Sequence, residues 1–442
     1  MPSLQRGEIR LAAFTMIGTA LLLQSAAVIW YPRLPFHHQL GSDFMAFYTA
    51  GRTLNRLPPA ARLYDPELQQ RLRIEIMPDA DQATRLPYLY PPFIAAAVSP
   101  LARLPYRWAF AAWLALGGAL YAAGLYLLQS CCRLGPHRST ALLLALSFTP
   151  FLFEAWGGGQ ISALAFSALA GALWLERARK PFAAGLCAGL CCYKPTVLLV
   201  LAALFVVARL GRMVAGVLVS SSVLAAVSFL MLGRDGAARY LRFIAQYGTA
   251  VTVKPSAWPL HKFVDPNAFF HLLLGGDTWV GRTLFLLAAV AALFVAARAW
   301  ARYRRAGPDQ RTLCWAGTMP VLLLASFYAP VYDATLMVLS GFLVAGVVYR
   351  KGRPELTRAF ESMVLLVYLG AIFSQPIARV LHLQVFTLIL AWSAVYMFSL
   401  GTGVRMRRPP AKPGVPITDG SPAGAAGSAL HLQAITGCGV RV

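Results

Sequence analysis

The chain has 442 residues, of which 58% are hydrophobic and only 13% are charged. Soluble domains carry about 25% charged residues, so this composition excludes an ordinary soluble protein and indicates a polytopic membrane protein. The net charge of +23 does not indicate nucleic-acid binding, because most Arg and Lys residues lie in short clusters between apolar runs, as the positive-inside rule describes.

The first apolar run, from Leu11 to Tyr31, is predicted to be the first membrane span, with the residues before it on the inner side. Ser25-Ala26-Ala27 would also suit a signal-peptide cleavage site. The apolar run continues beyond that site through Trp30, and the rest of the chain is also apolar, which favours an uncleaved span.

Residues 32–90 are predicted to form a long loop on the outer side. Within it, 43–57 has apolar residues at helical spacing and is followed by Pro58-Pro59, which predicts an amphipathic helix. Asp65-Pro66 is typical of the N-cap and first turn of a second short helix over 66–76. Such helices lie along a membrane surface, while the short, proline-broken stretch 91–104 is expected to be re-entrant or interfacial.

The remaining apolar segments predict an all-α bundle of about 12 transmembrane helices, within a range of 10–13. The spans after the first are expected near 106–128, 139–153, 160–175, 181–191, 195–208, 213–232, 281–298, 312–326, 334–349, 361–374 and 384–400.

The charge distribution favours this register. The proposed inner segments together hold 20 Lys and Arg residues, whereas the short outer segments hold only Lys194 and Arg379. Both ends of the chain are therefore expected in the cytoplasm, and a second outer loop is expected over 233–280. Residues 1–404 are expected to form one transmembrane domain, and 405–442 a disordered, basic cytoplasmic tail.

Asp43 is the first residue that suggests chemistry. It lies where the first outer loop begins to form a helix, so its simplest interpretation is a helix N-cap. The alternative is a base at the membrane surface, where partial loss of water would raise the basicity of a carboxylate into a useful range.

Several motifs in chain order resemble glycosyltransferase family 87, over most of residues 40–210. They are Gly41-Ser42-Asp43-Phe44 with Tyr48 and Ala50-Gly51, Leu63-Tyr64-Asp65, Tyr88-Leu89-Tyr90-Pro91-Pro92, Pro100-Leu101 with Leu104-Pro105, Gly159-Gln160-Ile161-Ser162, Glu176-Arg177, Ala184-Gly185 and Lys194-Pro195. Further along, Tyr332-Asp333 is present, but Tyr328 and Pro330 stand where that family usually has a histidine.

This resemblance implies a GT-C-type transmembrane bundle and the inverting transfer of a sugar from a polyprenyl-phosphate donor to an acceptor hydroxyl. Mannose is the sugar expected, and the acceptor would be a glycolipid or another glycan. Asp43 matches the acidic residue that these enzymes place in the first outer loop as general base. The expected location is a bacterial inner membrane, with the active site on the periplasmic face.

The leaving phosphate needs cations already in place. Lys194 is the basic residue of a short outer turn, and His261 and Lys262 lie in the second outer loop; all are candidates for the donor phosphate. Lys194 could equally be a snorkelling lysine ahead of a helix-starting proline.

Substrate-binding candidates are Gln160, Tyr48, Tyr90, Glu154 and Asp333. Gln160 follows three glycines, which permit close approach of the backbone to a substrate but also suit a flexible turn. Tyr90, beside Pro91-Pro92, could instead fix the turn into the membrane. No His and Asp cluster has metal-ligand spacing, so neither a metal nor another cofactor is expected.

Two other functions remain open from the residues alone. A lipid or glycan transporter or flippase would usually show repeats and ionisable residues in mid-span, neither of which is visible here. A non-catalytic envelope scaffold would require nothing of Asp43.

Overall fold

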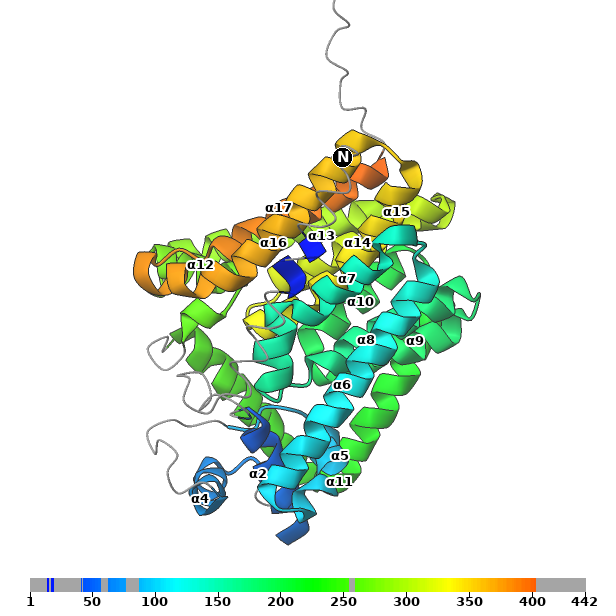
Figure 1. The fold of residues 1–442 in the computed structure, drawn as a ribbon. Coiled ribbons are helices and arrows are strands. Elements are labelled where there is room, and N and C mark those ends of the chain that lie inside the picture. Colours follow the sequence, from blue (N-terminus) through cyan, green and yellow to red (C-terminus); the bar gives the residue numbers. More distant parts are fainter. Residues whose placement is uncertain are drawn as a thin grey trace, which may run out of the picture. The chain divides into compact units, whose positions relative to one another are not determined.

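The structure is a computed structural model that describes residues 14, 15, 17–19, 41, 43–56, 63–76, 87–253 and 259–402, with the backbone alone for 247–253 and 402. Within these residues every regular element is helical (Figure 1). The one feature of β type there is an isolated antiparallel bridge between Phe263 and Pro330. The prediction of an all-α polytopic membrane protein is therefore confirmed. The expected tail over 405–442 lies outside the described residues.

The α-helices are α2 (Phe44–Arg56), α4 (Pro66–Ile76), α5 (Pro92–Val98), α6 (Tyr106–Cys131), α7 (Arg138–Ser147), α8 (Ser162–Arg177), α9 (Pro181–Gly189), α10 (Pro195–Val207), α11 (Gly211–Val253), α12 (Pro266–Leu273), α13 (Trp279–Ala301), α14 (Pro308–Leu324), α15 (Leu336–Lys351), α16 (Pro354–Leu381) and α17 (Val385–Thr402). The 3-10 turns are η2 (Leu101–Arg103), η3 (Gly135–His137), η5 (Leu190–Tyr193), η7 (Leu260–Lys262), η8 (Tyr303–Arg305) and η9 (Val331–Thr335), and η4 (Pro150–Gly157) is a π-helix.

The two short helices expected in the first outer loop are present. α2 buries one side, including Phe44, Phe47 and Tyr48, as its apolar spacing predicts. Asp65 caps α4, because its Oδ1 accepts hydrogen bonds from the amides of Glu67 and Leu68 at 3.0 and 3.1 Å. The stretch 91–104 forms α5 and η2, and both pack against α2.

Eleven of the twelve expected spans coincide with helices in the described part of the chain, and the first, Leu11 to Tyr31, lies mostly outside it. Five described helices are long and apolar enough to cross a membrane, or six if the bent pair Gly135–Ser147 and Pro150–Gly157 is one span. Shorter apolar helices, among them α10 and α17, fill much of the remaining length. The count of about twelve spans stays a prediction.

The region expected as the second outer loop is largely helical. α11 breaks at Gly233, where φ is 65° and ψ is −179°, but helical structure continues to Val253. After 254–258, which are not described, the chain forms η7 and α12 before α13 begins at Trp279. The break coincides with the predicted end of the apolar span, which stays a prediction as a membrane boundary. The region after it is helical where a loop was expected, because no local signal marked the continuation.

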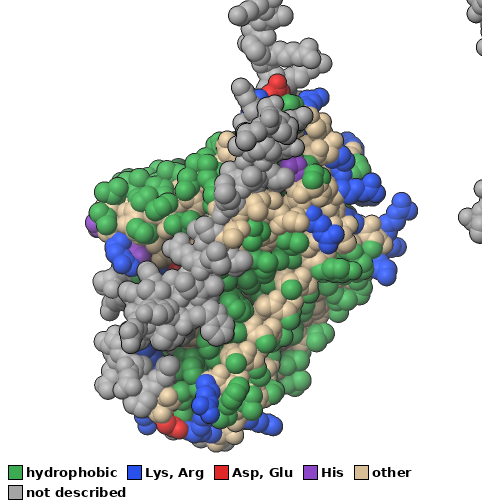
Figure 2. Space-filling model, in the orientation of Figure 1, with side chains coloured by type: hydrophobic (Ala, Val, Ile, Leu, Met, Phe, Trp, Pro, Cys, Tyr) green, Lys and Arg blue, Asp and Glu red, His purple; other side chains and the backbone are tan. Residues whose placement is uncertain are grey.

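The centre of the bundle is the helix from Val331 to Lys351. In its apolar window 89% of residues are buried, whereas the other long apolar helices have 33% or less. Around it, α14 packs against both α15 and α17, and α8 packs against α6 and α9. The lateral helices keep large apolar side chains exposed, such as Leu230 on α11 and Phe294 on α13, as expected of surfaces that face lipid. Figure 2 shows Lys and Arg gathered toward the upper right and lower end of one face, with hydrophobic side chains between them.

Candidate active site

The start of α2 is held against the π-helix η4 by backbone hydrogen bonds. The amide of Gly41 donates to the carbonyl of Gly157 at 2.9 Å, and the amide of Asp43 donates to the carbonyl of Gly158 at 3.1 Å. π-helical turns are rare and occur often at functional sites. Here the wide turn lets its last carbonyls point at a chain segment that lies more than a hundred residues earlier in the sequence.

Gly159 makes this docking possible. Its φ is +81°, and a Cβ added there would lie 2.6 Å from the Cβ of Phe44. Its carbonyl accepts a hydrogen bond from the indole of Trp113 at 2.9 Å. Both the left-handed conformation and the close approach require glycine, so the glycine run supports a close contact between backbone segments.

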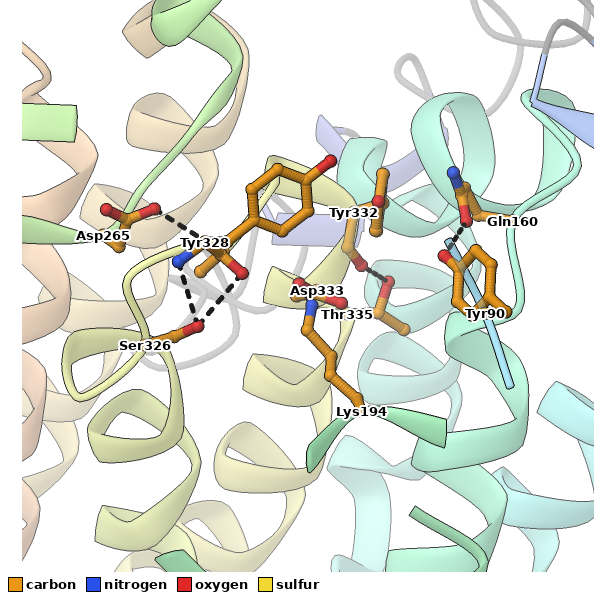
Figure 3. A network of polar contacts seen from close by, with 10 residues as sticks. Tyr90, Gln160, Lys194, Asp265, Ser326, Tyr328, Tyr332, Asp333 and Thr335 are labelled. Atoms are coloured by element: carbon orange, nitrogen blue, oxygen red, sulfur yellow. Dashed lines mark hydrogen bonds and ion pairs between the residues drawn. The ribbon is translucent and has the colours of Figure 1, made fainter. Parts of the chain in front are cut away.

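Asp43 and Gln160 are thereby brought together. Gln160 Nε2 donates to Asp43 Oδ2 at 2.8 Å, and Tyr90 Oη donates to Gln160 Oε1 at 2.8 Å. Figure 3 shows the pairing of Tyr90 and Gln160. Three residues that the sequence suggested separately therefore form one hydrogen-bonded group, and in the described part of the chain the Asp43 carboxylate is bound by a side chain and not by the first turn of α2.

Burial of the half-buried Asp43 raises the pKa of its carboxyl above the usual value. The hydrogen bond from Gln160 and the charge of Lys262 act in the opposite direction, while the charge of Glu154 raises the pKa further. A carboxylate with a raised pKa is a stronger base at neutral pH than an ordinary aspartate. Glu154 itself accepts a hydrogen bond from Gln375 Nε2 at 2.8 Å.

A second group lies beside the first. Lys194, which precedes α10, forms an ion pair with Asp333 of η9, and its ammonium lies 5.9 Å from the ring centre of Tyr332. Figure 3 shows the Lys194 side chain reaching toward Asp333. A small pocket next to this pair is lined by polar and apolar side chains, including Ser162, Tyr193 and Ser326.

Tyr90 connects the two groups, because the charges of both Asp43 and Asp333 act on its hydroxyl. The ring of Tyr90 lies 6.1 Å from that of Tyr193, the residue before Lys194. Asp43, Gln160, Tyr90, Tyr332, Asp333 and Lys194 therefore lie close together and form one polar cluster.

The segment before α12 borders this cluster. Asp265 caps α12 through the amide of Ala268 at 2.9 Å and accepts a second hydrogen bond from the amide of Ala329 at 2.8 Å. Burial is the main cause that raises the pKa of Asp265 to about 6. Together with the bond from Val264 N to Ala329 O at 2.8 Å, these contacts hold the strand-like segment that carries Lys262.

His261 and Lys262 lie on this segment, at the edge of the cluster. Arg379 of α16 lies 3.0 Å from His261 Nε2, and Gln384 donates to the His261 carbonyl at 2.9 Å. Burial, with the charges of Arg379 and Lys262, lowers the pKa of His261 to about 4. The imidazole is therefore neutral at pH 7 and can accept a hydrogen bond from Arg379.

Tyr48, another predicted site residue, lies apart from this cluster. It is fully buried, its hydroxyl donates to the carbonyl of Leu104 at 2.7 Å, and its ring packs against Phe44 and Tyr106. These contacts show that Tyr48 helps to pack α2 against η2, which is a sufficient structural reason for a tyrosine at this position. Its role in substrate binding stays a prediction.

The sequence did not single out Arg379, Tyr332 or Gln375 as site residues, although all three stood in segments that it placed on the outer side. Each of them meets its partner only because helices far apart in the chain pack together. The one local signal in the sequence was a polar residue at the end of an apolar run.

Among the described residues no group of three or more His, Cys, Asp or Glu side chains has the arrangement of a metal site. The expectation that no metal is needed stays a prediction.

The fold and this cluster define a class: a polytopic membrane protein that holds ionisable side chains at one end of its helix bundle. Comparison with known families specifies it further, because the family model of glycosyltransferase family 87 matches residues 88–326. The chain belongs to glycosyltransferase family 87 and is thus a membrane glycosyltransferase. No curated protein and no solved structure matches it. The matched region includes Tyr90, Gln160 and Lys194, while Asp43 lies before it.

Proposed function

We propose that this protein transfers a sugar, most simply mannose, from a polyprenyl-phosphate donor to an acceptor hydroxyl on the outer face of the membrane. Asp43 acts as the general base, and the anomeric configuration is inverted. The observation that carries this proposal is the Asp43 carboxylate, half-buried at the end of the bundle and held by the side-chain amide of Gln160 at 2.8 Å.

The reaction needs a base on one side of the anomeric carbon and an anion-stabilising group on the other. As the acceptor oxygen attacks that carbon, its proton passes to Asp43, and the bond between the carbon and the phosphate oxygen breaks. Attack opposite the leaving group inverts the configuration, and the lipid phosphate departs with the electron pair. Positive charge develops on the sugar in the transition state, as in glycoside hydrolysis.

The leaving phosphate gains negative charge, which preorganised cations stabilise. Lys194, His261 and Lys262 were the expected candidates, and Arg379 joins them through His261. Lys194 is already neutralised by Asp333, whereas Lys262 has no carboxylate partner among the described residues. This difference favours Lys262, with Arg379, as the first contact of an arriving phosphate.

Glu154 and Asp333 are the acidic candidates for sugar hydroxyls. Glu154 is half-buried, and its negative charge raises the pKa of Asp43. Gln375 donates a hydrogen bond to one of its two carboxylate oxygens. Its other oxygen can accept a hydrogen bond from a hydroxyl of the substrate.

We propose a bacterial inner membrane as the location, with the site on the periplasmic side. The lipid-linked sugar is the donor substrate, and the proposed reaction uses no cofactor.

The direct test is Asp43→Asn, which keeps the shape and the partner of the side chain but removes the base. Transfer from radiolabelled polyprenyl-phosphate mannose to a lipid extract of the source membranes should fall about 10²- to 10⁴-fold, the contribution typical of general base catalysis. Asp309→Asn is the matched control, because Asp309 is half exposed in an ion pair with Arg350. That variant should keep its activity.

Unchanged transfer by a folded Asp43→Asn protein would refute the proposed base. A wild-type protein that leaves the mannose donor intact but consumes a polyprenyl-phosphate donor of another sugar would instead correct the sugar. A comparison of glycolipids in cells with and without the gene would identify the acceptor class.

A further inference from the structure

The hydrogen bonds around Asp43 form a directed chain. The Tyr90 hydroxyl donates to Gln160 Oε1 at 2.8 Å, and Gln160 Nε2 donates to Asp43 Oδ2 at the same distance. Both hydrogen bonds therefore run in the same direction, from Tyr90 through Gln160 toward the Asp43 carboxylate.

The direction of this chain is determined by its two ends. An ionised carboxylate only accepts hydrogen bonds, so the amide group facing Asp43 must be the NH₂. If the amide flipped, its oxygen would face the carboxylate and its NH₂ would face the Tyr90 hydroxyl hydrogen. Tyr90 and Asp43 thus select one orientation of Gln160 between them.

We propose that Gln160 and Tyr90 are positioning residues for the catalytic base and do not serve primarily to bind sugar. Gln160 occupies Oδ2 of Asp43, leaves Oδ1 for the acceptor hydroxyl and stabilises the ionised form; Tyr90 keeps the amide turned the right way. This inference rests on the proposed function, since it assigns a role in the same site.

The surroundings support this division. Gln160 follows Gly159, whose close contact with Phe44 fixes the distance between the two backbone segments. The centre of the Tyr90 ring lies 4.7 Å from that of Phe47 of α2, so the helix that directly follows the base also supports Tyr90. A residue that bound mainly sugar would not need its amide held from both sides before substrate arrives.

The test is the pH profile of kcat/KM for Gln160→Leu, Gln160→Glu and Tyr90→Phe in the full-length protein, with polyprenyl-phosphate mannose as the probe. In Gln160→Leu the loss of the amide removes a hydrogen bond to a charged group. The value of kcat/KM should therefore fall about ten- to hundredfold below neutral pH. The acid limb should move to higher pH in Gln160→Leu, with activity recovering in alkaline buffer. Gln160→Glu, which has the same shape but adds a second carboxyl, should move it further. Tyr90→Phe should give a smaller shift in the same direction.

Gln69→Leu is the matched control. Gln69 is a buried glutamine whose amide donates to the Leu63 carbonyl at 2.6 Å and accepts from the Tyr88 amide at 2.8 Å. Its loss should lower thermal stability without moving the acid limb, which separates a positioning effect from general damage to the first outer loop.

Two results would overturn the inference: an acid limb that stays in place in Gln160→Leu, or a rise in KM for the donor with unchanged kcat and pH profile, which would indicate sugar contact. Failure of the proposed function is separate, because it would appear as activity of Asp43→Asn. An inactive Asp43→Asn protein beside an unshifted Gln160→Leu protein would reject the positioning role alone.

Discussion

The sequence allows two interpretations of Asp43, a helix N-cap and a catalytic base, and its contacts in the structure favour the second. Its position before α2 is typical of a helix N-cap, and Asp65 and Asp265 do cap helices through backbone amides. The carboxylate of Asp43 instead receives its hydrogen bond from Gln160, which is 117 residues further along the chain. A helix cap needs only local partners, so this distant partner favours a role in chemistry.

Variants of Lys194 and Asp333 can test whether this buried ion pair serves the stability of the protein or the binding of phosphate. Their side chains are only 18% and 10% exposed, and removal of one partner of a buried pair typically costs about 3–5 kcal/mol because the other charge stays unpaired. Lys194→Met and Asp333→Leu should therefore each lower the thermal stability of the purified protein in detergent. The double variant should recover much of that loss.

Transfer activity then separates the two roles of Lys194. If the lysine contributes to the phosphate site, the stable double variant remains slow. If transfer returns together with stability, the pair is purely structural. Simple addition of the two losses in stability would show that the charges do not interact.

At the scale of elements, the site depends on how α2 docks on η4 and the glycines that follow it. Three backbone hydrogen bonds, the Gly159 contact with Phe44 and the Trp113 indole all act within this junction. None of these contacts involves the reacting groups directly, but together they determine the separation of Asp43 and Gln160. The geometry of the base is thus a property of packing between two elements.

Gly159→Ala tests this junction. The added Cβ would lie 2.6 Å from that of Phe44, and the left-handed conformation costs an L-residue about 1–2 kcal/mol. Gly352→Ala is the matched control, because Gly352 also has a positive φ, of 59°, but has nothing within 4 Å. Both variants should lose similar stability from backbone strain, while only Gly159→Ala should lose most of its transfer activity. Equal activity in the two proteins would show that the docking of α2 is not critical.

The sequence predicted the elements better than their contacts. α2 and α4 were placed within a residue or two, because apolar spacing, a capping Asp and prolines are local signals. The π-helix η4 and the continuation of α11 beyond Gly233 gave no comparable signal. Likewise, Arg379 meets His261 across 118 residues, and Lys194 meets Asp333 across 139. Such partners are determined by tertiary packing, which no local pattern reports.

Across the whole described bundle, the candidate site and the basic clusters lie at opposite ends of the same helices. α8 begins just after Gln160 and ends at Arg177, and α15 begins just after Asp333 and ends at Lys351. At the far end, the hydroxyl of Tyr303, which follows α13, donates to Glu176 at 2.5 Å. By the positive-inside rule we therefore propose that the basic end faces the cytoplasm and the site faces the outer side.

This orientation can be tested by inserting a short epitope at one of two glycines. Gly275 lies just before α13, away from its Arg-rich end, whereas Gly352 follows α15 at the basic end. Neither has another atom within 4 Å of an added Cβ, so both sites should tolerate an insertion. In intact spheroplasts an antibody should bind the epitope at Gly275 but reach the epitope at Gly352 only after permeabilisation. Both proteins should retain transfer activity. The opposite pattern would place Asp43 on the cytoplasmic side, where the proposed acceptor and the outer-leaflet donor are absent, and the outer-face mechanism would fail even if the family assignment stands.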